Sequence, residues 1–146
     1  MLIRGAWWVC SDGMARPTIP VDVLDANRHP VHRRFLVDTG PDSTMFSAAL
    51  LGDLQLPTTP PPPGLSFHGI GGSSPVVLVS AVLEFARDDG GTAQVGGQVA
   101  AFTDPPATDM SVLGRDVLDM FDVIVSRRRD EVLLIAPSHV YGISGP

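Results

Sequence analysis

The stretch Phe35-Leu36-Val37-Asp38-Thr39-Gly40-Pro41-Asp42-Ser43-Thr44 joins an apolar run to a carboxylate, a hydroxyl and a glycine. Its first three residues form strands readily, which predicts a short buried strand. Gly40 permits a tight reversal after that strand, so we expect Asp38 and Thr39 inside the protein at a junction between strand and loop. A buried carboxylate must be paired, hydrogen-bonded or reactive, because desolvation disfavours its charged form.

A plain β-turn is the alternative interpretation of Asp38-Thr39-Gly40, since aspartate often accepts a hydrogen bond from the backbone two residues ahead. Two further segments favour an active site instead. The segment 67–72, Phe-His-Gly-Ile-Gly-Gly, has the composition of a glycine-rich hairpin tip. The segment 110–118, Met-Ser-Val-Leu-Gly-Arg-Asp-Val-Leu, again places an apolar pair before a glycine, followed by an amphipathic start.

These three segments, in this order, resemble the retropepsin family of aspartic proteases, over about residues 16–135. The resemblance implies that Asp38 is catalytic, with Thr39 fixing the loop and Gly40 admitting the substrate backbone. It implies a mobile flap whose tip, Gly69, Ile70, Gly71 and Gly72, closes over a bound peptide. It also implies that Leu113-Gly114-Arg115-Asp116 packs beneath the catalytic loop, and that Asp42 binds substrate main-chain donors and pairs with Arg115. The family usually has alanine where this chain has Pro41, and proline removes one backbone donor and restricts Gly40 to extended conformations.

The remaining pattern predicts an all-β protein, because short strands follow one another without alternating helices. We expect strands at 5–10, 19–24, 31–37, 75–85, 92–102, 122–126 and 132–135. One short C-terminal helix is expected at 115–121, with a possible turn of helix at 47–51. Gly96-Gly97 could mark a bulge or a close backbone approach. With the resemblance, the expected fold is a closed barrel of the acid-protease type with a β-hairpin flap, active as a homodimer.

A single domain is expected over residues 1–146, a length that supports one proper core. Residues 57–64 contain four consecutive prolines and predict a stiff internal connection, with a ligand for an SH3-type domain as the alternative. Residues 136–146 read as a loose tail. Cys10 is the only cysteine, so no intrachain disulfide is possible, and we expect a small buried side chain there.

Net charge is −6, and every cation except the histidines is an arginine, which argues against nucleic acid as a partner. No run reaches the length of a membrane span and no signal peptide is evident, so we expect a cytoplasmic protein without a membrane partner. His29 and His32 fit an exposed turn better than a metal site, because no Asp, Glu or Cys shares their spacing. We therefore expect neither metal nor cofactor.

The chain has one Asp-Thr-Gly and no second copy of that motif. Aspartic proteases need two carboxyl groups about 3 Å apart that share one proton. The second must then come from another chain across a two-fold axis, which predicts a homodimeric endopeptidase acting on peptides or proteins. A dimeric peptide-binding module with an inactive Asp38 is the main alternative. Phosphotransfer through an aspartyl nucleophile ranks far lower, because residues 38–42 match neither of its usual motifs.

Overall fold

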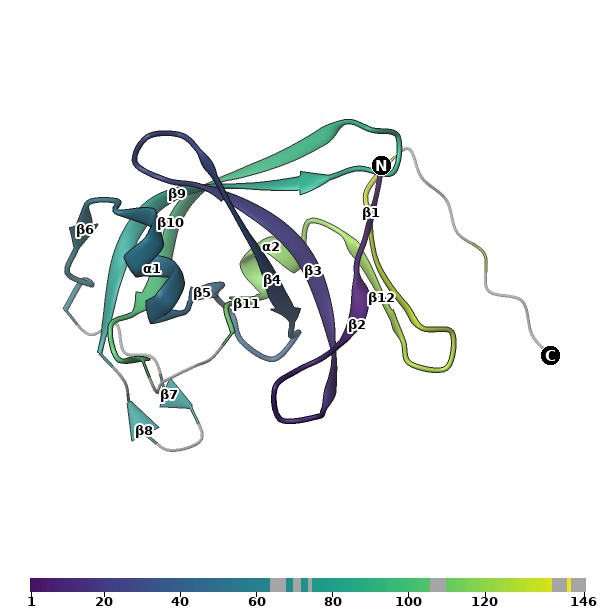
Figure 1. The fold of residues 1–146 in the computed structure, drawn as a ribbon, viewed down its shortest axis with the longest axis horizontal. Coiled ribbons are helices and arrows are strands. Elements are labelled where there is room, and N and C mark those ends of the chain that lie inside the picture. Colours follow the sequence, from purple (N-terminus) through teal and green to yellow (C-terminus); the bar gives the residue numbers. More distant parts are fainter. Residues whose placement is uncertain (64–67, 70–71, 74, 106–109, 138–141, 143–146) are drawn as a thin grey trace.

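Short strands joined by turns rich in glycine and proline build most of the chain (Figure 1). The computed structural model describes residues 1–63, 68–69, 72–73, 75–105, 110–137 and 142. The strands before the flap segment are β1 (Leu2–Arg4), β2 (Ala6–Val9), β3 (Ala15–Leu24), β4 (Pro30–Val37), β5 (Met45–Phe46) and β6 (Thr58–Thr59). The later strands are β7 (His68–Gly69), β8 (Gly72–Ser73), β9 (Val76–Ala86), β10 (Thr92–Phe102), β11 (Val112–Leu113), β12 (Asp122–Ser126) and β13 (Glu131–Ile135). The helices are α1 (Ala48–Leu54) and α2 (Arg115–Leu118).

The largest sheet closes on itself. Its strands follow the order β2-β3-β4-β11-β5-β10-β9-β6, and β3 also pairs with β9 through Asp22 opposite Glu84 and Val23 opposite Leu83. The strands from β3 round to β9 therefore form a barrel, which confirms the expected closed all-β architecture. A second sheet, in the order β1-β13-β12, packs beside it, and β7 pairs with β8 as a small separate hairpin.

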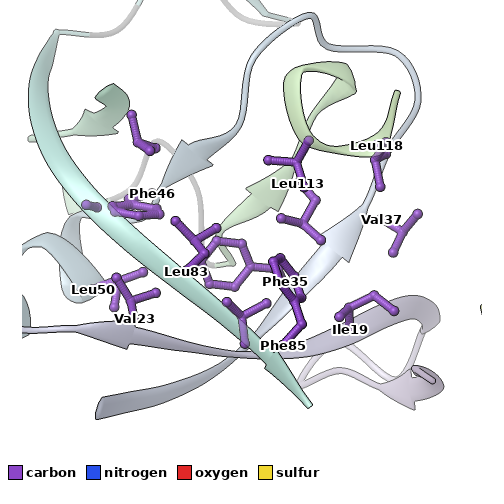
Figure 2. Packing of buried hydrophobic residues seen from close by; sticks show 14 of the residues in the cluster. Ile19, Val23, Phe35, Val37, Phe46, Leu50, Leu83, Phe85, Leu113 and Leu118 are labelled. Carbon is purple, nitrogen blue, oxygen red and sulfur yellow. The ribbon is translucent and has the colours of Figure 1, made fainter. Parts of the chain in front are cut away.

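The core fills the barrel and the space beneath the second sheet. Alternation along β4 turns Phe35 and Val37 inward, and Phe35 packs edge-to-face on Phe46 with ring centroids 5.8 Å apart. Figure 2 shows Phe35, Leu83, Phe85 and Leu113 meeting at the centre of this cluster. Because Val37 and Leu113 belong to the same core, the residues that follow each of them start from rigidly held strands.

The helices differ from the expectation in length. The helix expected at 115–121 is one short turn, α2, followed by turn hydrogen bonds from Met120 and Phe121. The possible turn of helix at 47–51 is the longer α1, whose N-terminus is capped by the Ser47 side chain accepting from the Leu50 amide. Leu50 and Leu54 of α1 are buried in the core, and this packing stabilises a helix that contains Gly52.

Gly96-Gly97 does not mark a bulge, so that expectation was wrong. The register between β9 and β10 runs without interruption from Thr92 opposite Ala86 to Phe102 opposite Val76. A Cβ atom on Gly97 would meet no atom within 4 Å, and the nearest atom to one on Gly96 would be the Ala81 carbonyl oxygen at 3.8 Å. Neither a bulge nor a close contact therefore requires glycine here.

Candidate active site

The loop that carries Asp38 leaves the barrel at the end of β4. Leu36 and Val37 pair in parallel with Val112 and Leu113 of β11, and the Asp38 amide donates to the Leu113 carbonyl at 3.3 Å. The parallel neighbours β4 and β11 thus end at the same place, and Asp38 is the first residue after β4. This arrangement holds the backbone of Asp38 at one end of the barrel and does not depend on its side chain.

The Asp38 carboxylate is oriented by its own loop. Its Oδ1 atom accepts a hydrogen bond from the Gly40 amide at 2.9 Å. This is the contact expected of a plain β-turn. It also fixes one carboxylate oxygen, and the other has no hydrogen bond to the described residues. The same geometry therefore fits both interpretations of Asp38-Thr39-Gly40, a plain β-turn and an active-site loop.

Burial of this loop differs from the expectation. Asp38 is half-buried, whereas Thr39 and Gly40 are exposed. The prediction that Asp38 and Thr39 lie inside the protein is wrong for a single chain, because the loop turns out of the barrel directly after Val37. A surface that covers this loop would have to come from outside the described chain.

A partly buried hydrogen-bond network anchors the far end of the loop. Oδ1 of Asp116 accepts from the Thr44 hydroxyl at 2.7 Å, from the Thr44 amide at 2.9 Å and from the Val117 amide at 2.9 Å. The Thr44 hydroxyl oxygen in turn accepts from the Gly114 amide at 3.0 Å. Sequence reasoning placed Asp116 beneath the loop but missed Thr44, whose only signal was its position at the end of the motif.

Gly114 is required by close packing. A Cβ atom there would lie 2.4 Å from the Ser43 carbonyl carbon and 2.8 Å from the Thr44 nitrogen. Backbone hydrogen bonds continue the contact, from Arg115 to the Pro41 carbonyl and from Asp116 to the Asp42 carbonyl, each at 3.0 Å. The segment 113–116 therefore lies directly under residues 41–44.

Arg115 and Asp42 form the ion pair that the resemblance implied. Both side chains are exposed, Asp42 at 82% and Arg115 at 49%. One carboxylate and one guanidinium therefore lie on the open side of the loop, beyond Asp38. An exposed pair of this kind contributes less than about 1 kcal/mol to stability, so folding alone gives little reason for it.

The candidate residues fall into two groups. Asp38, Thr39, Gly40, Asp42 and Arg115 are brought together at the end of β4 and the start of α2. Gly69 and Gly72 lie opposite each other on β7 and β8, a hairpin at the lower end of the molecule in Figure 1. Ile70 and Gly71, the expected tip of the flap, fall outside the described residues.

A groove that sequence reasoning missed opens beside the ends of β4 and β11. It has a volume of about 390 Å³. It is lined by Trp8, Val9, Cys10, Ser11, Asp12, Arg16, Leu36, Met110 and Val112. Leu36 is two residues from Asp38 and is paired with Val112, so the groove wall continues into the Asp38 loop. The lining residues lie too far apart in the chain to share a local pattern. The pair Trp7-Trp8 was the one sequence signal that pointed to this groove.

The two tryptophans point to opposite sides of β2, as alternation predicts. Trp7 packs against the core and its indole donates to the Ser126 carbonyl at 3.1 Å. Trp8 is 47% exposed, and the Arg34 guanidinium stacks 4.0 Å from its ring centroid. The exposed ring therefore forms one rigid, amphipathic wall of the groove.

An ion pair closes the far end of the groove. Arg16 donates to both carboxylate oxygens of Asp12, at 2.9 and 2.6 Å. This contact, together with the Met14 amide, lowers the pKa of Asp12 to about 2, and the same carboxylate raises the pKa of Arg16. Both groups are thus charged at any ordinary pH, but each largely neutralises the other.

Within the described residues, no group of three or more His, Cys, Asp or Glu side chains is arranged to hold a metal ion. His32 does have an acidic partner, since its Nδ1 lies 2.6 Å from Oδ1 of Asp22 on the neighbouring strand. No described helix is both long and apolar enough to cross a bilayer.

The closed barrel and its Asp-Thr-Gly loop have the fold and the motif of the retropepsin-like aspartic protease family. Residues 19–117 match the family described as Aspartyl protease, and the chain therefore belongs to that family. A search of curated proteins found no matching sequence.

Two solved structures share the fold. The EIAV protease in complex with the inhibitor HBY-793 is 22% identical, with a TM-score of 0.53, over 71% of this chain and 86% of that one. A retropepsin-like aspartic protease from Rickettsia conorii is 16% identical, with a TM-score of 0.51, over 92% of this chain and 88% of that one.

Proposed function

We propose that this chain is an aspartic endopeptidase whose active site forms when two copies bring their Asp38 carboxylates together. The observation that carries the proposal is the state of the Asp38 loop. Gly40 orients one oxygen of the carboxylate, while Thr39 and Gly40 are exposed in a single chain. A loop so firmly anchored yet open to solvent is suited to meet a second copy of itself.

Within the described residues, the acidic side chains of the loop itself and of the segment beneath it already have partners. Asp42 is paired with Arg115, and Asp116 is held by Thr44 and Val117. Both acids serve to shape the loop, so neither is free to share a proton with Asp38. A two-fold axis beside Thr39 would supply the missing group, and Thr39 could then hydrogen-bond across the axis.

Two such carboxyl groups would hydrolyse a peptide by general acid–base chemistry. The ionised aspartate takes a proton from a water whose oxygen attacks the scissile carbonyl carbon, while the protonated aspartate donates its proton to the carbonyl oxygen. The resulting diol collapses as a carboxyl group returns a proton to the nitrogen, and the C–N bond breaks. No metal or organic cofactor enters this sequence of steps.

The surroundings of Asp38 offer places for a substrate. The groove walled by Trp8, Leu36 and Val112 is apolar beside the catalytic loop and would take a substrate side chain. Asp42 would accept main-chain N–H groups, with Arg115 holding its carboxylate in place. The hairpin of β7 and β8, with Gly69, Ile70, Gly71 and Gly72, would close over the peptide and exclude water.

The first test is Asp38→Asn, assayed with a fluorogenic peptide library. The amide preserves the shape of the side chain but cannot exchange the proton, so activity should disappear while the fold and the thermal transition remain. Asp88→Asn, on the β9–β10 turn, controls for the loss of one exposed carboxylate. Activity retained by the purified Asp38→Asn protein would exclude the assignment. A wild-type protein that binds peptides without cleaving any would instead indicate the peptide-binding module.

The second test asks whether the site is shared. After subunit exchange with a ninefold excess of Asp38→Asn protein, random pairing leaves roughly one wild-type chain in ten with a wild-type partner. Specific activity per wild-type chain should therefore fall about tenfold. In the same excess of Asp88→Asn protein, which keeps its Asp38, mixed pairs should be active and activity per total chain should stay at the wild-type level. An undiminished rate after verified exchange would mean that each chain acts alone.

A further inference from the structure

Two opposite charges line the groove beside the Asp38 loop. Asp12 and Arg16 are the charged residues among the described ones that line it, and the others are apolar or uncharged. Both belong to the β2–β3 hairpin, whose turn lies at the lower side of the molecule in Figure 1, toward which β4 runs. An ion pair in the wall of a groove can decide which side chains that groove accepts.

Strand register brings Arg16 to the groove. Arg16 lies directly opposite Trp8 in the β2–β3 pairing, and residues opposite each other point to the same face of a sheet. The Trp8 ring walls the groove, so the Arg16 side chain reaches the groove beside that ring. Arg34 stacks on the same ring and donates to the Thr18 hydroxyl at 3.2 Å, but it is not among the described residues that line the groove.

Asp12 is oriented by the turn that precedes Arg16. The Cys10 amide donates to the Met14 carbonyl, and the Gly13 amide donates to the Cys10 carbonyl, each at 2.9 Å. Gly13 has a φ of +83°, which glycine adopts without strain and which this tight turn requires. Oδ1 of Asp12 accepts from the Met14 amide at 2.9 Å. Backbone contacts therefore hold the Asp12 carboxylate where Arg16 can bind it.

The two charges offset each other. Nη1 and Nη2 of Arg16 bind the two carboxylate oxygens of Asp12 at 2.9 and 2.6 Å, a bidentate geometry. The hydrogen bond with Arg16 is the main cause that lowers the pKa of Asp12 to about 2, so the pair stays ionised at neutral pH. A charged substrate side chain in this groove would lose hydration beside apolar walls, while each possible partner is already engaged. An uncharged side chain carries no such penalty.

We propose that Asp12 is a specificity-determining residue, which holds Arg16 and thereby makes the groove select uncharged substrate side chains over acidic or basic ones. The inference rests on the proposed function in taking the groove as a site for a substrate side chain, and it does not depend on cleavage. Loss of Asp12 leaves a cation in the wall, and loss of Arg16 leaves an anion. The two changes should therefore shift the charge preference of the groove in opposite directions.

The test measures peptide binding in the Asp38→Asn background, so that no peptide is cleaved. A set of fluorescein-labelled peptides carries glutamine, glutamate or arginine at each position in turn, and dissociation constants are obtained from fluorescence anisotropy. At one position, glutamine should bind at least about threefold more tightly than glutamate or arginine. Asp12→Asn should shift that preference toward glutamate by about threefold or more, and Arg16→Gln should shift it toward arginine by a similar factor.

The double variant Asp12→Asn/Arg16→Gln is the sharpest comparison, because its groove is uncharged again. It should return to the wild-type preference for glutamine, although both single variants lose it. Asp53→Asn and Arg33→Gln break a different exposed ion pair, between α1 and β4, which does not line the groove, and they should leave every preference unchanged. Thermal unfolding of each variant checks that its fold is intact.

Three results would overturn the inference: charge preferences that stay the same in the two single variants, shifts in the same direction for both, or binding of none of the peptides. Cleavage by the protein with Asp38 intact judges the proposed function separately. Opposite charge shifts without any cleavage would retain Asp12 as a specificity residue and discard the endopeptidase. Cleavage with unshifted preferences would retain the endopeptidase and discard this role of Asp12.

Discussion

Oγ1 of Thr44 lies 2.7 Å from Oδ1 of Asp116, 72 residues further along the chain, and the two side chains join the Asp38 loop to α2. The same hydroxyl accepts from the Gly114 amide at 3.0 Å. Thr44 is 1% exposed, so its own hydroxyl is shielded from water, whereas Asp116 is exposed. The geometry of the Asp38 loop therefore depends on a pair of polar side chains that never approach a substrate.

Thr44→Val should weaken this anchor, because valine matches threonine in shape but leaves Asp116 and the Gly114 amide short of a partner. The free energy of unfolding should fall by about 1–3 kcal/mol in a urea titration. Thr103→Val, whose exposed hydroxyl makes a single long bond to the Pro75 carbonyl, should change it by less than about 0.5 kcal/mol. Equal losses for the two variants would show that this network is unimportant.

Gly114→Ala tests the close packing under residues 41–44. The added methyl group would lie 2.4 Å from the Ser43 carbonyl carbon, so the loop must move, at a cost of about 1–3 kcal/mol or more. Activity should fall by more than the loss of folded protein explains. Gly97→Ala, where a Cβ meets no atom within 4 Å, is the matched control and should be neutral or slightly stabilising. Thermal unfolding and peptide cleavage measured together distinguish the two outcomes.

Asp42→Asn should separate stability from activity. Its pair with Arg115 is exposed, so unfolding should change by less than about 1 kcal/mol. If Asp42 accepts main-chain donors of the substrate, KM should rise several-fold while the thermal midpoint hardly moves. Asp53→Asn removes a comparable exposed ion pair, with Arg33, away from the loop and should leave KM unchanged. A KM unaffected by Asp42→Asn would remove this residue from the substrate site.

Arg16→Gln should restore an ordinary titration to Asp12. Arg16 lowers the pKa of Asp12 to about 2 from 3.8, so the pair stabilises the β2–β3 turn above pH 3.8 and is lost as pH falls through about 2. NMR titration of the Asp12 carboxyl group should give a midpoint near 2 in the wild type and a clearly higher one in the variant. The Met14 amide continues to donate to Asp12, so the pKa should remain somewhat below 3.8.

Local patterns in the sequence were sufficient to predict the positions of most strands. The boundaries expected for residues 92–102 and 122–126 coincide with β10 and β12 as the structure has them. Alternating apolar residues and turn signals carry this information, because strand periodicity and tight turns depend on neighbours in the chain. The Asp42–Arg115 pair was also anticipated, but through the family resemblance rather than through any local pattern.

Contacts between strands that are distant in the chain could not be predicted from local sequence patterns. The spacing around His32 contains no acidic partner for it, and Asp22, which lies directly opposite it on β3, comes from the neighbouring strand. The groove beside Asp38 likewise assembles Trp8, Leu36 and Val112 from three separate strands. Cross-strand neighbours are set by register, and a search of sequence spacing alone does not reveal register.

The sequence by itself determined that this chain has an Asp-Thr-Gly loop after a buried strand, a single copy of it, and a glycine ahead of α2. Only the tertiary structure decided what surrounds that loop. It left Thr39 and Gly40 exposed, placed Gly114 against the Ser43 carbonyl and closed the network of Thr44 and Asp116. The physical reason is that burial and hydrogen-bond partners depend on how the barrel closes, and closure joins strands that lie far apart in the chain.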